Sequence, residues 1–520
     1  MPMPASAAQR RTPPVVMWLV AAAFVVILNE TIMMNAIPQL MEGLQIDEVA
    51  AQWLSTAFML TMASVIPVTG WFLQRVTTRT AFATAMTVFS IGTALAVVAP
   101  AFPVLLAARI IQASGTAVMM PLLMTTLMTV VPARDRGRVM GNVTLVMSVA
   151  PALGPAVAGV LLQLGSWRLI FAVVLPIAVV VATFGLRRLP NVGEQREQSI
   201  DWFSVVVAAL GFGGLVFGLS RFGQGLGAEP WLIVGASLLA ILGFVLRQLQ
   251  LQRHGNPLLD LRTFQHTVFT RAVLLLSVGF MSMLGAMILL PLYLQDLRGL
   301  SALQTGLLVM PGGIAMGLLG PRVGRTFDRY GSKLLIIPGA LGASAALMSL
   351  TLIGGSTPYW QLLAAHMLLM VSLAAVFTPA FTLGLGDVPG HLYSHGSSIL
   401  GTMQQVAGGL GTAVVITIMT ARAGSLASGG AAPLEAAVGG MRWGFGFGAV
   451  MSLVMVALVL LMPNRLPEQE ATPDHGAGER DQPEREVAQP EPRLEAGQPE
   501  PGLRAGPELP TPVGVQARSR

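Results

Sequence analysis

The sequence has no cysteine and little charge. A chain without cysteine forms no disulfide and offers neither a thiolate metal site nor a cysteine nucleophile. Asp, Glu, Lys and Arg make up 11% of the 520 residues, whereas soluble domains carry roughly 25%. The sequence also contains no phosphate-binding loop, zinc motif or nucleophile elbow, which argues against an enzyme and against ATP-driven transport. Hydrophobic residues reach 53%, a composition typical of polytopic membrane proteins.

Apolar runs long enough to cross a membrane follow one another along the chain. A helix needs about 20 apolar residues to cross the hydrocarbon core. Fourteen runs meet this criterion, at 14–37, 52–73, 81–101, 103–130, 139–162, 168–186, 202–220, 231–249, 269–294, 303–322, 333–354, 359–386, 398–421 and 440–462. The expected fold class is therefore an all-α polytopic membrane protein with fourteen transmembrane helices.

The charges between the runs predict the orientation in the membrane. If the N-terminus is cytoplasmic, nineteen Lys and Arg fall on the cytoplasmic side and five on the other, namely Arg168, Arg221, Arg298, Arg422 and Arg442. This bias is the positive-inside rule. We therefore expect a multi-pass protein of the bacterial cytoplasmic (inner) membrane with both termini in the cytoplasm. The basic charge is a topology signal, so no nucleic-acid partner is expected.

The ends and linkers differ from the apolar runs in composition. Residues 1–13 form a short N-terminal tail, and 187–201 and 250–268 are charged linkers on the cytoplasmic side. Residues 464–520 are rich in Pro, Glu, Gly, Gln and Arg. Such a segment cannot bury enough apolar surface to fold, so we expect a disordered cytoplasmic tail.

An internal repeat divides the chain into halves. After the second run the sequence is Gly70-Trp-Phe-Leu-Gln74-Arg75-Val-Thr77-Thr-Arg79, and after the tenth it is Gly324-Arg-Thr-Phe-Asp328-Arg329-Tyr-Gly331-Ser-Lys333. Both segments follow the second span of a six-span unit. The repeat predicts two six-helix bundles, 14–186 and 269–463, with 202–249 inserted as an extra helix pair. Repeated halves with a site between them are a transporter architecture.

One carboxylate, Glu30, lies well inside an apolar run. An ionisable group in the membrane is expensive and is a functional hypothesis by default. Glu30 could exchange a proton near neutral pH, or it could be a structural partner of Arg109 in the fourth run. Arg109 is itself a costly buried charge, and Gln112 lies one helical turn from it on the same face.

Several further groups have two interpretations each. Gln404 and Gln405 face either a substrate or a neighbouring helix, and His366 is either a relay or a packing residue. Arg134, Arg136 and Arg138 are most simply topological anchors. Six methionines could line an adaptable pocket or simply pack: Met119, Met120, Met124, Met281, Met283 and Met287.

These motifs resemble the major facilitator superfamily, and specifically its fourteen-span drug/proton antiporter branch of EmrB-like and lincomycin-resistance-like pumps. The resemblance covers residues 14–463. The segment Gly70–Arg79 is similar to the signature Gly-x-x-x-Asp-Arg-x-Gly-Arg, with departures at Gln74 and Thr77, and the second copy is more complete. Leu28-Asn29-Glu30-Thr31-Ile32 resembles Leu-Asp-x-Thr-Ile, with Asn29 in the usual Asp position. The carboxylate is thus displaced by one residue, about 100° around a helix.

The resemblance implies roles for the matching residues. Gly70, Arg75, Arg79, Gly324, Asp328, Arg329 and Gly331 would form a conformational latch, weaker in the first copy. Gly154, Pro155 and Gly159 match the antiporter signature, and Glu30 with Arg109 would couple protons. The expected substrate cavity includes Asn29, Gln112, Met120, Gln404 and Gln405.

The expected function is efflux of amphipathic drugs or other small toxic compounds by alternating access. The proton motive force would drive it, without a cofactor or metal. The expected partners are the substrate and the lipid bilayer. We expect a monomer, joined in a two-membrane bacterium by a membrane-fusion partner. The alternatives are a dedicated exporter of one metabolite, antibiotic or siderophore, and a non-transporting sensor or scaffold.

Overall fold

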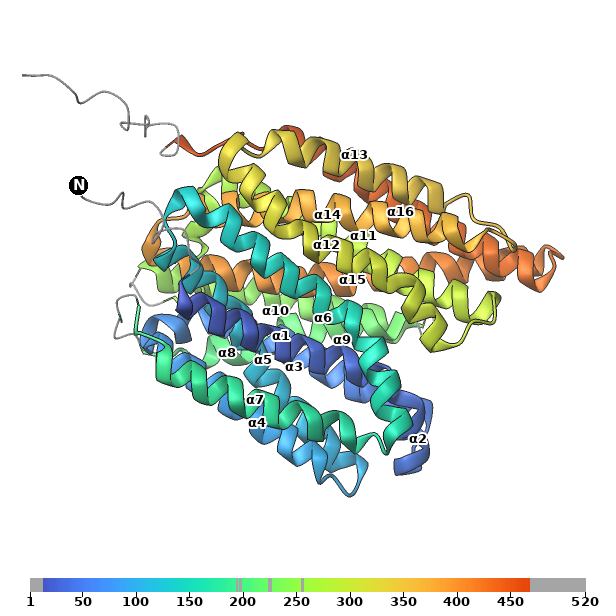
Figure 1. Cartoon of the computed structure of the whole chain (residues 1–520), viewed down its shortest axis with the longest axis horizontal. Helices are drawn as coiled ribbons and strands as arrows, with labels where there is room; N and C mark the ends of the chain where they lie inside the picture. The colour runs from blue at the N-terminus through green and yellow to red at the C-terminus, as the bar shows by residue number, and fades with distance from the viewer. Residues whose placement is uncertain (1–12, 193–194, 196–198, 223–226, 254–256, 468–520) are drawn as a thin grey trace, which may run out of the picture. The chain divides into compact units, whose positions relative to one another are not determined.

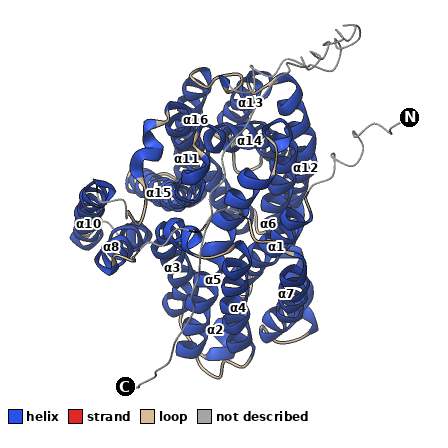
Figure 2. Cartoon of the chain, turned by 90° about the vertical axis from the view of Figure 1, so that its left-hand side faces the viewer, coloured by secondary structure: helices blue, strands red, loops and turns tan. Residues whose placement is uncertain are grey.

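The computed structural model describes residues 13–192, 195, 199–222, 227–253 and 257–467. Of the tail expected at 464–520, residues 468–520 lie outside the described part of the chain, whereas 464–467 lie inside it and Leu466 is buried. Residues 1–12 of the expected N-terminal tail also lie outside it. The described part of the chain is helical and contains no strand (Figure 2). Fourteen of its helices are long and apolar enough to cross a membrane, which confirms the count predicted from the sequence.

The first six-helix bundle consists of α1 (Pro14–Met34), α3 (Glu48–Arg75), α4 (Thr78–Val97), α5 (Phe102–Val130), α6 (Arg136–Leu164) and α7 (Arg168–Arg188). A short helix, α2 (Ile37–Leu44), follows α1 and was not expected. The second bundle consists of α11 (Thr267–Leu292), α12 (Ala302–Tyr330), α13 (Lys333–Leu350), α14 (Tyr359–Asp387), α15 (Tyr393–Ser428) and α16 (Pro433–Leu460). The two bundles lie side by side (Figures 1 and 2).

The extra helix pair lies to one side of both bundles (Figure 2). Its first span is α8 (Trp202–Ala208), a π-helical turn η3 (Ala209–Gly213) and α9 (Gly214–Arg221), and its second is α10 (Ala228–Arg253). A second π-helical turn, η6 (Tyr293–Leu297), extends α11. A 3₁₀ turn, η5 (Leu261–Gln265), precedes α11, and others precede α6 (η2, Ala133–Asp135) and α15 (η7, Gly390–Leu392).

Local sequence explains where several helices begin. The side chains of Asp47 and Thr77 accept hydrogen bonds from the first turns of α3 and α4. Ser301 and Gln304 form a capping box at the start of α12. Such caps satisfy backbone N–H groups that have no partner within the helix.

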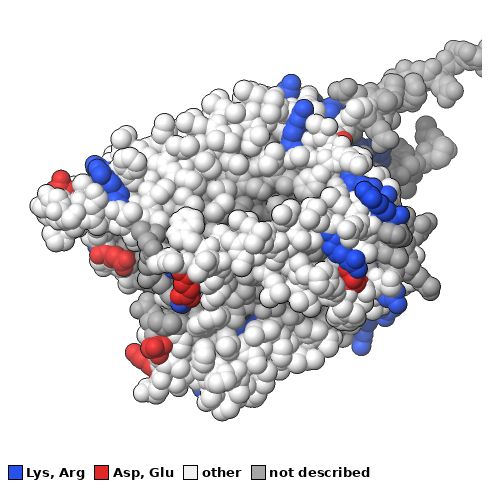
Figure 3. All heavy atoms as spheres, turned by 180° about the vertical axis from the view of Figure 1, so that it is seen from behind, with Lys and Arg blue, Asp and Glu red and all other residues white. Residues whose placement is uncertain are grey.

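Charge separates the two ends of the bundle. We call the end where α3, α5, α12 and α14 finish the basic end. Its exposed basic residues include Arg75, Arg79, Arg134, Arg322, Arg325, Arg329 and Lys333. Figure 3 shows Lys and Arg gathered there, and most of the visible Asp and Glu at the opposite end. The opposite end carries exposed Glu42, Asp47, Glu229, Asp296 and Glu435.

Candidate functional site

The first helix places Glu30 and Asn29 in different surroundings. Asn29 is fully buried, and neither polar atom of its amide has a hydrogen-bond partner. Glu30, one residue further along α1, is partly exposed. The 100° rotation between neighbouring helical residues accounts for the difference. The carboxylate, and not the amide in the family's usual acidic position, is therefore the accessible polar group.

Arg109 of α5 is held in a buried network. Its guanidinium donates to the Gln112 Oε1 at 2.9 Å and to the Leu54 carbonyl at 3.5 Å, and it lies 4.1 Å from the centre of the Phe58 ring. The Gln112 amide in turn donates to the Thr93 hydroxyl of α4 at 2.9 Å. The network joins α3, α4 and α5. Its bond between Arg109 and Gln112 links two residues one turn apart on the same face of α5.

Glu30 and Arg109 interact without forming an ion pair. Each charge acts electrostatically on the other. No contact within 4.0 Å joins the carboxylate and the guanidinium in the described part of the chain. A structural ion pair between α1 and α5 is therefore not formed in this conformation. The carboxylate has an attractive charge nearby but is free of a direct basic partner.

The predicted antiporter motif lies beside Glu30. A Cβ added at Gly154 of α6 would lie 2.6 Å from the hydroxyl oxygen of Thr31, so α1 and α6 touch at the residue that follows Glu30. Pro155 faces Gly306 of α12 across the two bundles. A Cβ at Gly159 would meet only Leu303, at 3.6 Å. Within the motif, Gly154 thus sets how closely α1 approaches α6, whereas Gly159 does not.

A series of small residues joins α6 to α12. From the basic end, Gly137 faces Gly324, Gly141 faces Gly320, and Ala152 faces Gly313. Small residues let helix backbones approach closely in membranes. Contacts between the two helices continue from Gly137 to Pro155, so this seam between the bundles is closed along most of its length.

Asp328, from the second copy of the repeat, bridges the same two helices at the basic end. Its carboxylate accepts hydrogen bonds from the backbone N–H of Gly137 at 2.8 Å and of Arg138 at 2.7 Å. Both groups belong to the first turn of α6, where backbone N–H groups lack partners within the helix and the helix dipole favours negative charge. Asp328 therefore caps a helix of the other bundle.

The first copy makes a weaker connection to α15. Gln74 donates from its side-chain amide to the His391 carbonyl at 2.8 Å, and its Oε1 is buried without a partner. Nearby, the hydroxyls of Thr69 and Ser398 share a hydrogen bond of 2.7 Å, and a Cβ at Gly70 would meet His395 and Ser398. The repeat thus forms related contacts, α3 with α15 and α12 with α6. The bond made by Asp328 involves a carboxylate, whereas the bond made by Gln74 involves a neutral amide.

The other predicted latch residues are three basic side chains and Gly331. Arg75, Arg79 and Arg329 are exposed, and Arg329 lies over the Tyr330 ring. Gly331 has φ +86°, a conformation that favours glycine. The next residue, Ser332, donates a hydrogen bond of 2.6 Å to the carbonyl of Pro463, in the segment after α16.

Sequence reasoning missed Arg136 as a residue that joins the bundles. Its guanidinium donates to the Tyr393 hydroxyl of α15 at 3.2 Å and to the Met128 carbonyl at 2.9 Å. From the sequence alone, Arg136 is most simply a topological anchor. The signal available was its position at the start of α6, the fifth span of its half, because α15, the fifth span of the other half, also begins at the basic end.

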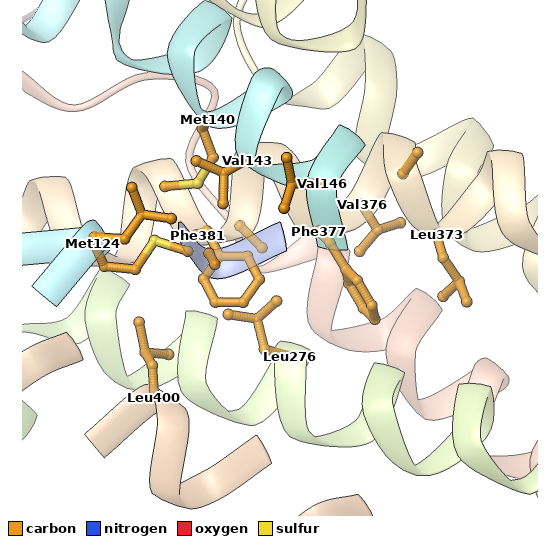
Figure 4. Close-up of a cluster of buried hydrophobic side chains, with 14 of the residues drawn as sticks. Met124, Met140, Val143, Val146, Leu276, Leu373, Val376, Phe377, Phe381 and Leu400 are labelled. Carbon is orange, nitrogen blue, oxygen red and sulfur yellow. The ribbon is translucent and has the colours of Figure 1, made fainter. Parts of the chain in front are cut away.

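Apolar side chains from both bundles fill the space between the polar bridges. Figure 4 shows Met124, Met140, Val143 and Val146 of the first bundle against Leu276, Leu373, Val376, Phe377, Phe381 and Leu400 of the second. All are buried. Because Asp328, Gln74 and Arg136 join the bundles at one end and this cluster packs behind them, the two bundles are closed together at the basic end.

The expected cavity residues are dispersed. Gln404 and Gln405 of α15 are half-buried and make no hydrogen bond with another described residue. Met120 is half-buried against the main core. His366 is buried between α14 and α12, against Gly312. A cavity of about 440 Å³ lies elsewhere, at the basic end, lined by residues that include Gln74, Thr125, Arg136 and His391.

Comparisons with known proteins agree with this arrangement. YcnB of Bacillus subtilis (strain 168), an uncharacterized MFS-type transporter, is 37% identical over 87% of this chain and 96% of its own. The lincomycin resistance protein LmrB of the same organism is 35% identical over 79% of this chain and 86% of its own. The putative multidrug resistance protein MdtD of Escherichia coli O6:K15:H31 is 28% identical over 76% and 84%.

Solved structures share the fold. The human organic anion transporter MFSD10 superposes with a TM-score of 0.63 at 15% identity, covering 86% of this chain and all of that one. The proton:xylose symporter XylE gives 0.61 at 15% identity, covering 86% and 95%. The sequence model of the Major Facilitator Superfamily matches residues 19–412 of this chain. With its two six-helix bundles and these matches, the chain belongs to the major facilitator superfamily.

Proposed function

We propose that this protein exports amphipathic small molecules in exchange for protons across the bacterial cytoplasmic membrane. The basic end would face the cytoplasm, as the positive-inside rule favours. The observation that carries the proposal is Glu30, a partly exposed carboxylate inside the first span, within electrostatic range of the buried Arg109. The resistance proteins among the relatives support drugs or other toxic compounds as substrates.

The geometry supports an alternating-access cycle. In the structure the bundles are joined at the basic end, and the opposite conformation would separate Asp328 from α6 and Gln74 from His391. Protonation of Glu30 from outside would remove its negative charge and release a cationic substrate, and loss of the proton to the cytoplasm would reset it. One proton crossing ~100 mV supplies about 2.3 kcal/mol, so the protein needs no cofactor. One chain contains both bundles, so a monomer suffices, with a membrane-fusion partner in a two-membrane bacterium.

Proteoliposomes with an imposed pH gradient test the proposal directly. Uptake of labelled lipophilic cations and neutral compounds is measured for the unmodified chain, for Glu30→Gln and for Glu42→Gln, a matched change at an exposed acid of the opposite end. We expect Glu30→Gln to abolish proton-driven transport and Glu42→Gln to retain it. Normal transport by Glu30→Gln would refute the assignment of Glu30.

An exporter of one compound is the second candidate, because the name of LmrB refers to a single antibiotic. The same proteoliposomes separate the two. A multidrug exporter is competed by many unrelated compounds, whereas a dedicated exporter is competed only by close analogues of its substrate.

A further inference from the structure

The extra helix pair lies against both bundles at once. A Cβ added at Gly213 of η3 would lie 2.5 Å from the hydroxyl of Ser64 of α3, and the rings of Trp53 of α3 and Phe217 of α9 are 5.5 Å apart. On α15, Gly409 faces α9, and Ala413 packs in an apolar cluster with Leu215, Leu219 and Phe222 of the pair. The pair therefore spans the seam between α3 and α15.

The part of this seam that the pair covers is distant from the basic end. Nearer the basic end, α3 and α15 touch directly, through Thr69 with Ser398 and Ile66 with Gly401. Further along, Ser64 and Trp53 of α3 and Gly409 of α15 contact the extra pair. The other seam, between α6 and α12, is closed by their own small residues. The pair therefore covers the part of the α3–α15 seam that lies away from the basic end.

At the basic end, a polar belt joins the two helices of the pair. We use this name for Asp201, Ser204, Arg247, Gln248, Gln252, Asp260 and Arg262. Arg247 donates to Asp201 at 3.0 Å, and Gln248, fully buried, donates to Ser204 at 2.8 Å. The Gln248 Oε1 accepts from the backbone N–H groups of Leu258 and Leu259 at 2.8 and 3.2 Å.

The belt continues along the linker that leads to the second bundle. Gln252 donates to Asp260 at 3.1 Å, and Arg262 donates to the same carboxylate at 2.7 Å. Burial alone would raise the pKa of Asp260, but hydrogen bonds from Arg262, together with the electrostatic attraction of the nearby His395 of α15, hold this pKa below its usual value. The turn η5 that follows packs on α11 and α15. The pair is therefore bonded to the second bundle through its linker.

The contacts with the two bundles differ in kind. A buried amide that accepts two backbone N–H groups cannot slide without leaving those donors unpaired, at about 1–3 kcal/mol each. In the described part of the chain, the contacts of Ser64 and Trp53 of α3 with the pair are with a small residue and with an aromatic ring. The Ser64 hydroxyl donates to its own helix at 2.8 Å and reaches the Ala209 carbonyl only at 3.5 Å. When one helix slides along another, such contacts can be replaced by similar ones at little cost in free energy.

We propose that the extra helix pair moves with the second bundle as one body, and that α3 slides against it when the cavity changes sides. This inference rests on the proposed alternating-access function. The pair then acts as a movable side wall that keeps the α3–α15 seam covered while the bundles rotate. The hydrogen bonds of the polar belt determine that the pair moves with the second bundle and not with the first.

Cysteine cross-linking tests the proposal, because the chain has no native cysteine. Ser64→Cys with Gly213→Cys would link the pair to α3, and Ser237→Cys with Gly214→Cys would link α9 to α10 within the pair. The geometry is matched, since each glycine's added Cβ would lie 2.5 Å from the serine hydroxyl. We expect oxidation to lower transport at least tenfold in the first variant, reversibly with reductant, and less than twofold in the second. Unchanged transport by the oxidised 64–213 variant would overturn the proposal.

A distance measurement keeps the inference testable if no substrate is found. Spin labels at Leu239 and Ile91 report the pair against the first bundle, and labels at Leu239 and Leu341 report it against the second; all three side chains are exposed. Opening the basic end with Asp328→Asn should change the first distance and leave the second unchanged. The reverse pattern would overturn the inference, whereas absence of transport in every variant would count against the proposed function alone.

Discussion

Replacing Asp328 by Asn should weaken the closure of the basic end. The Asp328 carboxylate accepts two short hydrogen bonds from the first turn of α6, at 2.8 and 2.7 Å. Asn keeps one acceptor oxygen and loses the charge. One N–H group of Gly137 or Arg138 therefore loses its partner, and the other keeps only a neutral bond.

The size of the effect follows from these two bonds. Hydrogen bonds to charged groups contribute about 1.5–3 kcal/mol and neutral ones about 0.5–1.5 kcal/mol. A carboxylate at a helix N-terminus adds about 0.3–1 kcal/mol. The substitution should destabilise the closed conformation by about 2–4 kcal/mol. A free-energy difference of about 1.4 kcal/mol changes an equilibrium constant tenfold. The population open at the basic end should therefore increase by a factor of between about 30 and several hundred.

Thiol labelling measures this population. Ser398, fully buried at the α3–α15 seam, is replaced by Cys as the only thiol in the chain. The rate of reaction with a membrane-impermeant reagent, applied from the basic end, is proportional to the open fraction while that fraction is small. The control is Asp135→Asn, which removes a carboxylate next to α6 that makes no side-chain cap hydrogen bond. Equal labelling rates in the Asp328→Asn and Asp135→Asn backgrounds would refute the reasoning.

Two further substitutions test the contacts between helices. Gly154→Ala places a methyl group 2.6 Å from a threonine hydroxyl of α1. The overpacking should lower the free energy of unfolding by about 1–3 kcal/mol and displace Glu30. Transport should fall at least tenfold, whereas transport by Gly159→Ala, a change in the same motif, should stay within twofold of the unmodified chain. Gln74→Met removes one neutral hydrogen bond, worth about 1 kcal/mol; labelling of Cys at position 398 should rise only about fivefold, and a rise as large as that of Asp328→Asn would contradict the asymmetry between the two latches.

Local features of the sequence were enough to predict the helices and part of the site. Fourteen apolar runs of sufficient length specify fourteen spans, because a backbone in hydrocarbon must satisfy its hydrogen bonds within the segment. The bond between Arg109 and Gln112 was also predictable, since residues three apart on a helix share a face. The short helix α2 and the π-helical turns were not predicted, because no local pattern in their sequences distinguishes them from the adjoining helices.

The tertiary structure decided which polar groups are accessible and which are joined. Sequence spacing shows that Asn29 and Glu30 point in different directions, but only the packing of α1 against its neighbours shows that Asn29 is buried and Glu30 is partly exposed. The repeat located Asp328 and Gln74 in equivalent loops. Their partners, the first turn of α6 and the carbonyl of His391, lie 191 and 317 residues away along the chain. Contacts at such separations depend on how helices of two bundles pack, and no local pattern encodes that packing.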